Sequence, residues 1–249
     1  MTLQHVDILF KLIVFLFAIS FHESAHAWMA NRCGDPTARM LGRISLNPIK
    51  HIDPLGTILL PLVAMFTHIP VLGWAKPTPV DPRNFRRPVL DDILTSVVGP
   101  ISNFIVASGA VLILAAISFT SQIGHGIVQN MPWAYLTNNL DVLAAQTNSV
   151  LMPIGLLAYE LLVINVVLGV FNLIPVPPLD GSTGIMLFMG ETRAQRYLDW
   201  LRGNSYAMVG LVLAVVGFGY VFSPIEGAAM DTLLPEQLLV PLFRTIFRH

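Results

Sequence analysis

The sequence predicts an all-α integral membrane protein, because of its composition, its long apolar stretches and a proline-broken apolar segment between two of them. Of the 249 residues, 54% are hydrophobic and 12% are charged, whereas a soluble domain carries about 25% charged residues. The net charge of −1 gives no indication of nucleic-acid binding. We therefore expect the lipid bilayer to surround the protein and expect no nucleic acid among its partners.

Four stretches are long enough to cross the bilayer core, which takes about 20 helical residues. They comprise residues 7–30, 93–119, 150–175 and 204–223. No positively charged start precedes the first stretch, so we expect a retained span rather than a cleaved signal peptide. After the fourth stretch, the apolar run Leu233–Phe247 is too short to span, which predicts an interfacial helix.

A fifth apolar segment, residues 54–75, decides the topology. It contains no Asp, Glu, Lys or Arg, but three prolines and two glycines interrupt it. If it crossed the membrane, the basic residues on its two flanks would face opposite sides, although basic residues of short loops gather on the cytoplasmic side. If it enters and returns, as broken backbone can do where protein covers it, eleven of the 14 basic residues share one side. We therefore predict a re-entrant segment, for which a β-hairpin is one form, and about four transmembrane helices.

The first span contains a metal-binding pattern, Phe21–His26, which reads Phe-His-Glu-Ser-Ala-His. His22 and His26 are one helical turn apart on one face, so both can bind a single zinc ion. Glu23 has the spacing of the general base in metalloproteases. Ionisable residues inside a span are costly and usually functional. Because the zinc would activate water below the membrane surface, the natural substrate is a peptide bond that is also in the membrane.

A catalytic zinc usually has three protein ligands and one open position, and Asp180 is the candidate for the third. It lies in Asn172–Gly181, where prolines break the helix at the end of the third span. A re-entrant segment 54–75 brings Asp180 to the same side as His26, whereas a full crossing would separate them by the membrane. The alternative role of Asp180 is to cap the short helix that follows it.

Other polar residues near the spans have two interpretations each. Asn172 could hold a substrate strand or the developing oxyanion, or form an interhelical hydrogen bond. Asn103 could likewise bind substrate, although packing is the alternative. His51 and His68 flank or lie in the re-entrant segment and could serve as spare ligands or have structural roles. Glu160 lies about 30 Å along a helix from the third ligand, so it is not a ligand.

Taken together, these motifs resemble the site-2 protease family of intramembrane zinc metalloproteases. The resemblance rests on His22-Glu23-x-x-His26, Gly73–Pro77, Gly99–Asn103, Asn172–Gly181 and, for the compact prokaryotic members, Gly34–Pro54. It implies that Asp180 is the third zinc ligand, that Glu23 is the catalytic base and that the active site faces the cytoplasm from within a prokaryotic plasma membrane. The implied substrates are single-span regulatory membrane proteins cut within or next to their spans.

We expect one membrane-embedded metalloprotease domain over residues 1–249, without the PDZ or CBS modules of some relatives. Its catalytic core comprises residues 7–190, followed by the C-terminal span and tail, residues 204–249. One zinc ion would activate the water that attacks the peptide carbonyl. The alternatives are a membrane zinc protease of the prenyl-protein-processing type and a non-catalytic metal-binding membrane protein. The sequence does not identify the substrate or the oligomeric state.

Overall fold

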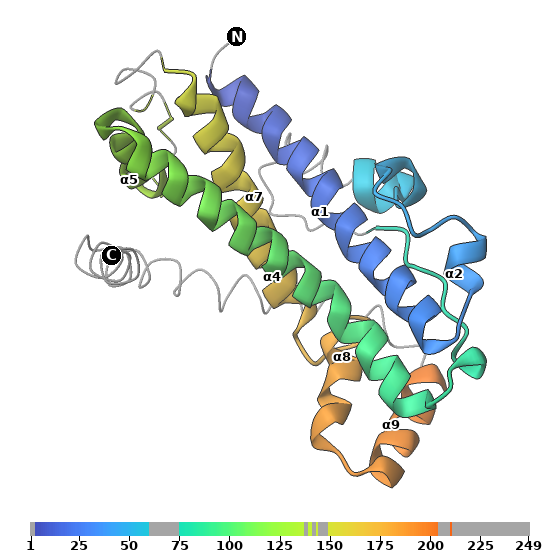
Figure 1. The fold of residues 1–249 in the computed structure, drawn as a ribbon. Helices are drawn as coiled ribbons and strands as arrows, with labels where there is room; N and C mark the ends of the chain where they lie inside the picture. Colours follow the sequence, from blue (N-terminus) through green and yellow to red (C-terminus); the bar gives the residue numbers. More distant parts are fainter. Residues whose placement is uncertain are drawn as a thin grey trace.

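The protein is a bundle of long helices, of which three are long and apolar enough to cross a membrane within the part described. The computed structural model describes residues 3–59, 75–136, 139, 140, 143, 149–203 and 210. The three helices are α1 (Leu3–Cys33), α4 (Pro88–Thr120) and α7 (Leu151–Asn172). They lie side by side and contact one another (Figure 1). These residues form no strand, so the prediction of an all-α membrane protein is confirmed for them.

Apart from η2 (Pro54–Leu59), which lies beside α1, the short elements lie at the two ends of this bundle (Figure 1). Helix α5 (Gln122–Leu136) is at the end that contains the N-terminus, where Met131 packs with Leu156 of α7. Residues 120–149 therefore contain a helix that the sequence did not predict. The opposite end holds α2 (Thr37–Met40), η1 (Pro48–Lys50), η3 (Pro82–Asn84), α8 (Gly181–Gly184), η4 (Ile185–Phe188) and α9 (Glu191–Gly203).

Local sequence explains where the long helices begin and end. Pro88 opens α4, a position where its missing N–H has no helical partner to lose. Asp91 in the first turn accepts the Arg87 N–H at 2.8 Å, and its charge suits a helix N-terminus. Helix α7 ends at Asn172, and the prolines that follow cannot continue it.

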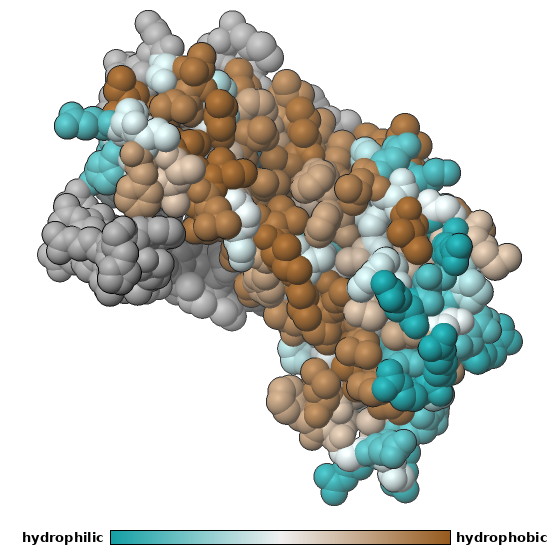
Figure 2. Space-filling view, viewed as in Figure 1, coloured by the Kyte–Doolittle hydropathy of each residue, from teal (hydrophilic) through white to brown (hydrophobic). Residues whose placement is uncertain are grey.

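The surface has the pattern expected of a membrane protein. Apolar residues cover the middle of the bundle, and hydrophilic residues gather mainly at the end that holds α2 and α9 (Figure 2). Ile105 and Leu112, two turns apart on α4, are 62% and 64% exposed. A contiguous apolar surface of this kind marks contact with lipid or another protein.

The three long helices match the first three predicted spans. The fourth predicted span, residues 204–223, and the tail, residues 224–249, lie outside the described residues apart from Gly210. The described residues therefore contain three helices that are long and apolar enough to cross a membrane, and the expected fourth span stays a prediction.

The two ends of the predicted re-entrant segment meet. The Lys76 N–H donates to the His51 carbonyl at 2.9 Å. The buried Arg43 guanidinium donates to the carbonyls of Lys50 and Lys76, so it joins the same two chain segments. Residues Pro54–Leu59 form η2, a single turn of π-helix, and the path of residues 60–74 lies outside the described part.

Candidate metal centre

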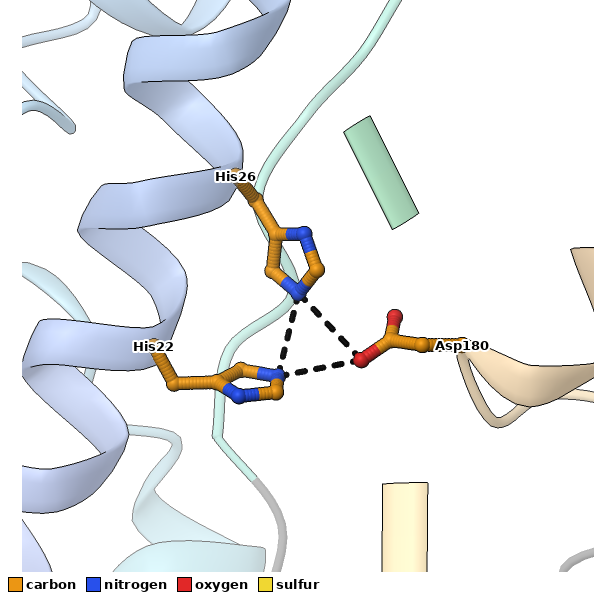
Figure 3. A group of neighbouring side chains, drawn as sticks. All are labelled: His22, His26 and Asp180. Carbon is orange, nitrogen blue, oxygen red and sulfur yellow. Dashed lines mark hydrogen bonds and ion pairs between the residues drawn. The ribbon is translucent and has the colours of Figure 1, made fainter. Parts of the chain in front are cut away.

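Three side chains converge from two distant parts of the chain (Figure 3). His22 and His26 are one turn apart on α1, and Asp180 directly precedes α8. The Nε2 atoms of the two histidines are 3.0 Å apart. Asp180 Oδ2 lies 3.2 Å from His22 Nε2 and 3.4 Å from His26 Nε2. The three potential ligand atoms therefore form one compact triangle.

The second nitrogen of each histidine has its own partner. His22 Nδ1 lies 2.7 Å from Asn103 Oδ1, and His26 Nδ1 lies 2.6 Å from the Thr95 carbonyl. Because amide and carbonyl oxygens accept hydrogen bonds, each Nδ1 carries the proton. Each Nε2 consequently presents a lone pair toward the centre of the triangle, which is the tautomer that binds a metal.

These atoms fit a zinc ion. Two lone pairs and a carboxylate oxygen face one another, and among the described residues no hydrogen-bond donor reaches the buried Asp180 Oδ2. Without a cation between them, these three electron-rich atoms would repel one another. Tetrahedral zinc with bonds of about 2.0–2.1 Å places ligand atoms about 3.3 Å apart, close to the observed 3.0–3.4 Å. A helix-capping role has less support, since Asp180 makes no side-chain cap bond to α8.

The turn before Asp180 brings its carboxylate to the histidines. Gly181 follows Asp180, and a Cβ there would lie 2.2 Å from the Leu173 carbonyl oxygen. Only glycine lets the chain fold back this closely on the end of α7. The prolines and the glycine predicted to break the helix thus also set the position of Asp180.

Glu23 lies beside the triangle rather than in it. Its Oε2 accepts hydrogen bonds from the Thr78 N–H at 2.8 Å and from Thr78 Oγ1 at 2.7 Å. The Glu23 carboxylate is also near enough to interact electrostatically with His26, Arg43 and His51. Thr78 could not be singled out from the sequence, because nothing in residues 75–81 predicts that this loop runs beside α1.

The amide group of Asn103 is used within the protein. It bonds to His22 through Oδ1 and donates to Asn165 Oδ1 through Nδ2, at 2.9 Å. Asn172 donates to the Leu168 carbonyl at 3.0 Å, and its predicted contact with substrate stays a prediction. Asn165 was not among the predicted site residues, although a polar residue inside an otherwise apolar span is a signal of function.

The remaining candidates lie outside the triangle. His51 is buried, and its Nε2 donates to the Ser45 carbonyl at 2.7 Å. Burial lowers the pKa of His51, and this outweighs the opposing effect of the bond to Ser45. Glu160 is near the middle of α7, with its Oε1 3.7 Å from Lys11 Nζ. His68 lies outside the described residues.

A His-Glu-x-x-His helix and a converging carboxylate, set among apolar helices, define a membrane metalloprotease. Residues 10–217 match the family model described as Peptidase family M50. The chain is 37% identical over 242 residues to the protein named "Putative zinc metalloprotease YwhC" of Bacillus subtilis (strain 168), with 96% of this chain and 93% of that protein covered. No solved structure matches the chain. The chain therefore belongs to peptidase family M50, the site-2 proteases, and is a metalloendopeptidase.

Proposed function

We propose that the protein is a zinc-dependent intramembrane endopeptidase that cleaves the transmembrane segments of single-span regulatory membrane proteins. The observation that carries the proposal is the position of the triangle of His22, His26 and Asp180 among helices that are apolar enough to span a membrane. A site at that depth acts on peptide bonds that also lie in the bilayer.

One zinc ion would be held by His22, His26 and Asp180, whose potential ligand atoms lie close together. When bound, zinc lowers the pKa of a water molecule toward neutrality and polarises the substrate carbonyl. The prenyl-protein-processing alternative takes its third ligand from a Glu on a later helix. Here the third corner of the triangle is Asp180, and the buried Glu160 lies near the middle of α7.

Glu23 is the general base. Thr78 holds Oε2 with two hydrogen bonds, which fixes the orientation of the carboxylate. The second carboxylate oxygen, Oε1, takes the proton of the attacking water. The same oxygen then returns the proton to the leaving amine, as general acid–base catalysis requires.

Residues 54–75 form a re-entrant segment beside which the substrate unwinds. The bond between His51 and Lys76 supports this, because a segment that crossed the membrane would separate those residues by the bilayer core, about 30 Å. An unwound substrate needs main-chain partners in a region with little water, and a strand edge there would supply them. In this proposal Asn172, the last residue of α7, contacts the same strand.

The active site faces the cytoplasm. The ends of α1 and α7 and the start of α4 lie at the end of the bundle that carries α2 and α9 (Figure 1). Basic residues gather there, including Arg32, Arg87 and Arg193. Short basic segments stay on the cytoplasmic side of a plasma membrane, which orients Asp180 and both histidines toward that side.

Co-expression with a panel of single-span membrane proteins tests this function. The parent should produce fragments whose new termini fall inside a span, as located by mass spectrometry, and Glu23→Gln should not. Glu191→Gln makes the same chemical change at an exposed position of α9 and should behave as the parent. Identical fragments from the parent and Glu23→Gln would rule the proposal out.

A further inference from the structure

We infer that Asn165 of α7 is a positioning residue for the metal centre, which acts through Asn103 of α4 to hold the tautomer and orientation of His22. The inference rests on the proposed zinc site. Asn165 touches none of the three ligands in the contacts found, so its effect has to be transmitted. It is the distal member of a hydrogen-bonded relay that crosses three helices.

The relay consists of four groups joined end to end. Asn165 Nδ2 donates to the Leu161 carbonyl at 2.8 Å, and Asn165 Oδ1 accepts from Asn103 Nδ2 at 2.9 Å. Asn103 Oδ1 in turn lies 2.7 Å from His22 Nδ1. Every step is within normal hydrogen-bond distance.

The first group of the relay fixes the direction of all the others. The Leu161 carbonyl can only accept, so Asn165 must turn its NH₂ toward it and its oxygen toward Asn103. Asn103 must then present its NH₂ to Asn165 and its oxygen to His22. His22 Nδ1 therefore has to be the donor, and Nε2 is left with the lone pair that a metal requires.

Burial makes this relay costly to disturb. Asn103 and Asn165 are both 0% exposed, so neither amide can exchange its partner for bulk water. A buried polar group without a partner is unfavourable, and a fully satisfied network is rigid. Loss of Asn165 would leave Asn103 Nδ2 without an acceptor and free the amide to rotate away from His22.

The two histidines differ in how they are held. His26 Nδ1 is bound by the main-chain carbonyl of Thr95, which no substitution removes. His22 Nδ1 is bound by a side chain, and that side chain depends on a second one. Zinc binding is therefore expected to be sensitive to substitutions in α7 that lie outside the ligand set.

Zinc affinity of the purified full-length protein, measured by competition with a chromophoric chelator, tests the inference. Loss of a group that hydrogen-bonds to a metal-binding histidine lowers metal affinity by about 10–100-fold. Asn103→Leu should weaken binding within that range, and Asn165→Leu, one step further away, by about three- to tenfold. In Asn165→Asp, the buried and therefore protonated carboxyl keeps an oxygen acceptor for Asn103 and an O–H donor for the Leu161 carbonyl, so zinc affinity should be close to the parent value.

Asn130→Leu is the matched control. Asn130 Nδ2 donates to the Gly126 carbonyl four residues earlier, as Asn165 does to Leu161, but on α5. Its substitution should leave zinc affinity unchanged. Visible absorption of the cobalt-loaded proteins gives a second readout: the bands should shift for Asn165→Leu and match the parent for Asn165→Asp and Asn130→Leu. If Asn165→Leu does not fold, Asn165→Ala replaces it with the same expectations.

Two results would overturn the relay. One is parent-like zinc affinity together with a parent-like cobalt spectrum in Asn165→Leu. The other is an equal loss of affinity in Asn130→Leu, which would indicate a general effect of replacing a helical asparagine by leucine. If the parent itself binds no zinc, the proposed function fails, and the relay fails with it. Tight zinc binding by the parent with no effect at residue 165 contradicts the relay alone.

Discussion

Gly99 of α4 lies directly against His26 of α1: a Cβ at residue 99 would be 2.3 Å from His26 Nε2 and 2.7 Å from His22 Cε1. Helix α4 is thus one wall of the candidate metal centre, although none of the three potential ligands comes from it. Both imidazoles are fixed at Nδ1, so they have little freedom to move away from an added methyl group.

Gly99→Ala should therefore reduce zinc affinity by about tenfold or more, comparable to losing a hydrogen-bond partner of a ligating histidine. Chelator competition on the purified protein measures this. Gly109→Ala is the control on the same helix, because a Cβ there meets nothing within 4 Å. Parent-like zinc binding in Gly99→Ala would show that the histidines are not held in the observed positions.

Thr78→Val should lower the rate of peptide cleavage and leave the zinc content unchanged. It removes the hydroxyl that donates to Glu23 Oε2, and the Thr78 N–H remains to hold the carboxylate. We expect a loss of about 10–100-fold, a part of the 10²–10⁴ that general acid–base catalysis contributes. Initial rates of cleavage of a single-span substrate test this. The control is Thr120→Val, at the C-terminal end of α4. An unchanged rate would show that the Thr78 hydroxyl does not position the Glu23 carboxylate.

Asp35 should contribute stability that is lost in acid. It is fully buried and accepts hydrogen bonds from Thr37, from the Asp81 N–H at 2.7 Å and from Asn84 at 2.9 Å. Burial raises the pKa of Asp35, but these bonds outweigh it and lower the pKa below 3.8. Because the folded pKa is below the unfolded one, the stabilisation is complete above about pH 4 and disappears as the pH falls through the folded pKa.

Thermal unfolding as a function of pH measures the contribution of Asp35. Asp35→Asn should lower stability near neutral pH by about 1.5–3 kcal/mol, the usual value for hydrogen bonds to a charged group. The difference from the parent should shrink in acid. Asp199→Asn, at an exposed position of α9, should follow the parent at every pH. A constant difference between parent and Asp35→Asn would contradict the pKa argument.

Lys11→Met should destabilise the far end of the bundle without affecting zinc. Lys11 Nζ lies 2.6 Å from Asp7 Oδ2 and 3.7 Å from Glu160 Oε1, and both carboxylates are buried. Unpairing a buried charge costs about 3–5 kcal/mol, but the Lys11 side chain is 47% exposed, so we expect about 1–3 kcal/mol. Detergent-solubilised thermal unfolding reports the change, and zinc content should equal that of the parent. A loss of zinc would indicate that the two ends are coupled.

Much of this arrangement could be predicted from the sequence. The lengths of the apolar stretches gave three spans that match α1, α4 and α7. The spacing of His22 and His26 gave two neighbouring donors, and the distribution of basic residues gave the end of the bundle at which Asp180 would meet them. These features depend on local periodicity and on which side of a membrane a segment lies.

The contacts made by Gly99, Thr78 and Asn165 could not be predicted in this way. They depend on how each helix is rotated about its axis, and a helix that is apolar on all sides carries little information about its rotation. The path of residues 75–81 along α1 depends on tertiary hydrogen bonds such as those to Asp35 and Glu23. Only the assembled bundle identifies these residues as part of the site.

Zinc stoichiometry in purified protein tests the central claim most directly. The parent should contain one zinc ion per chain by elemental analysis, and Asp180→Ala should contain far less, because only the two histidines would remain as ligands. Glu23→Gln should keep the full amount, since Glu23 lies outside the triangle. One zinc per chain in Asp180→Ala would contradict the claim that Asp180 is the third ligand.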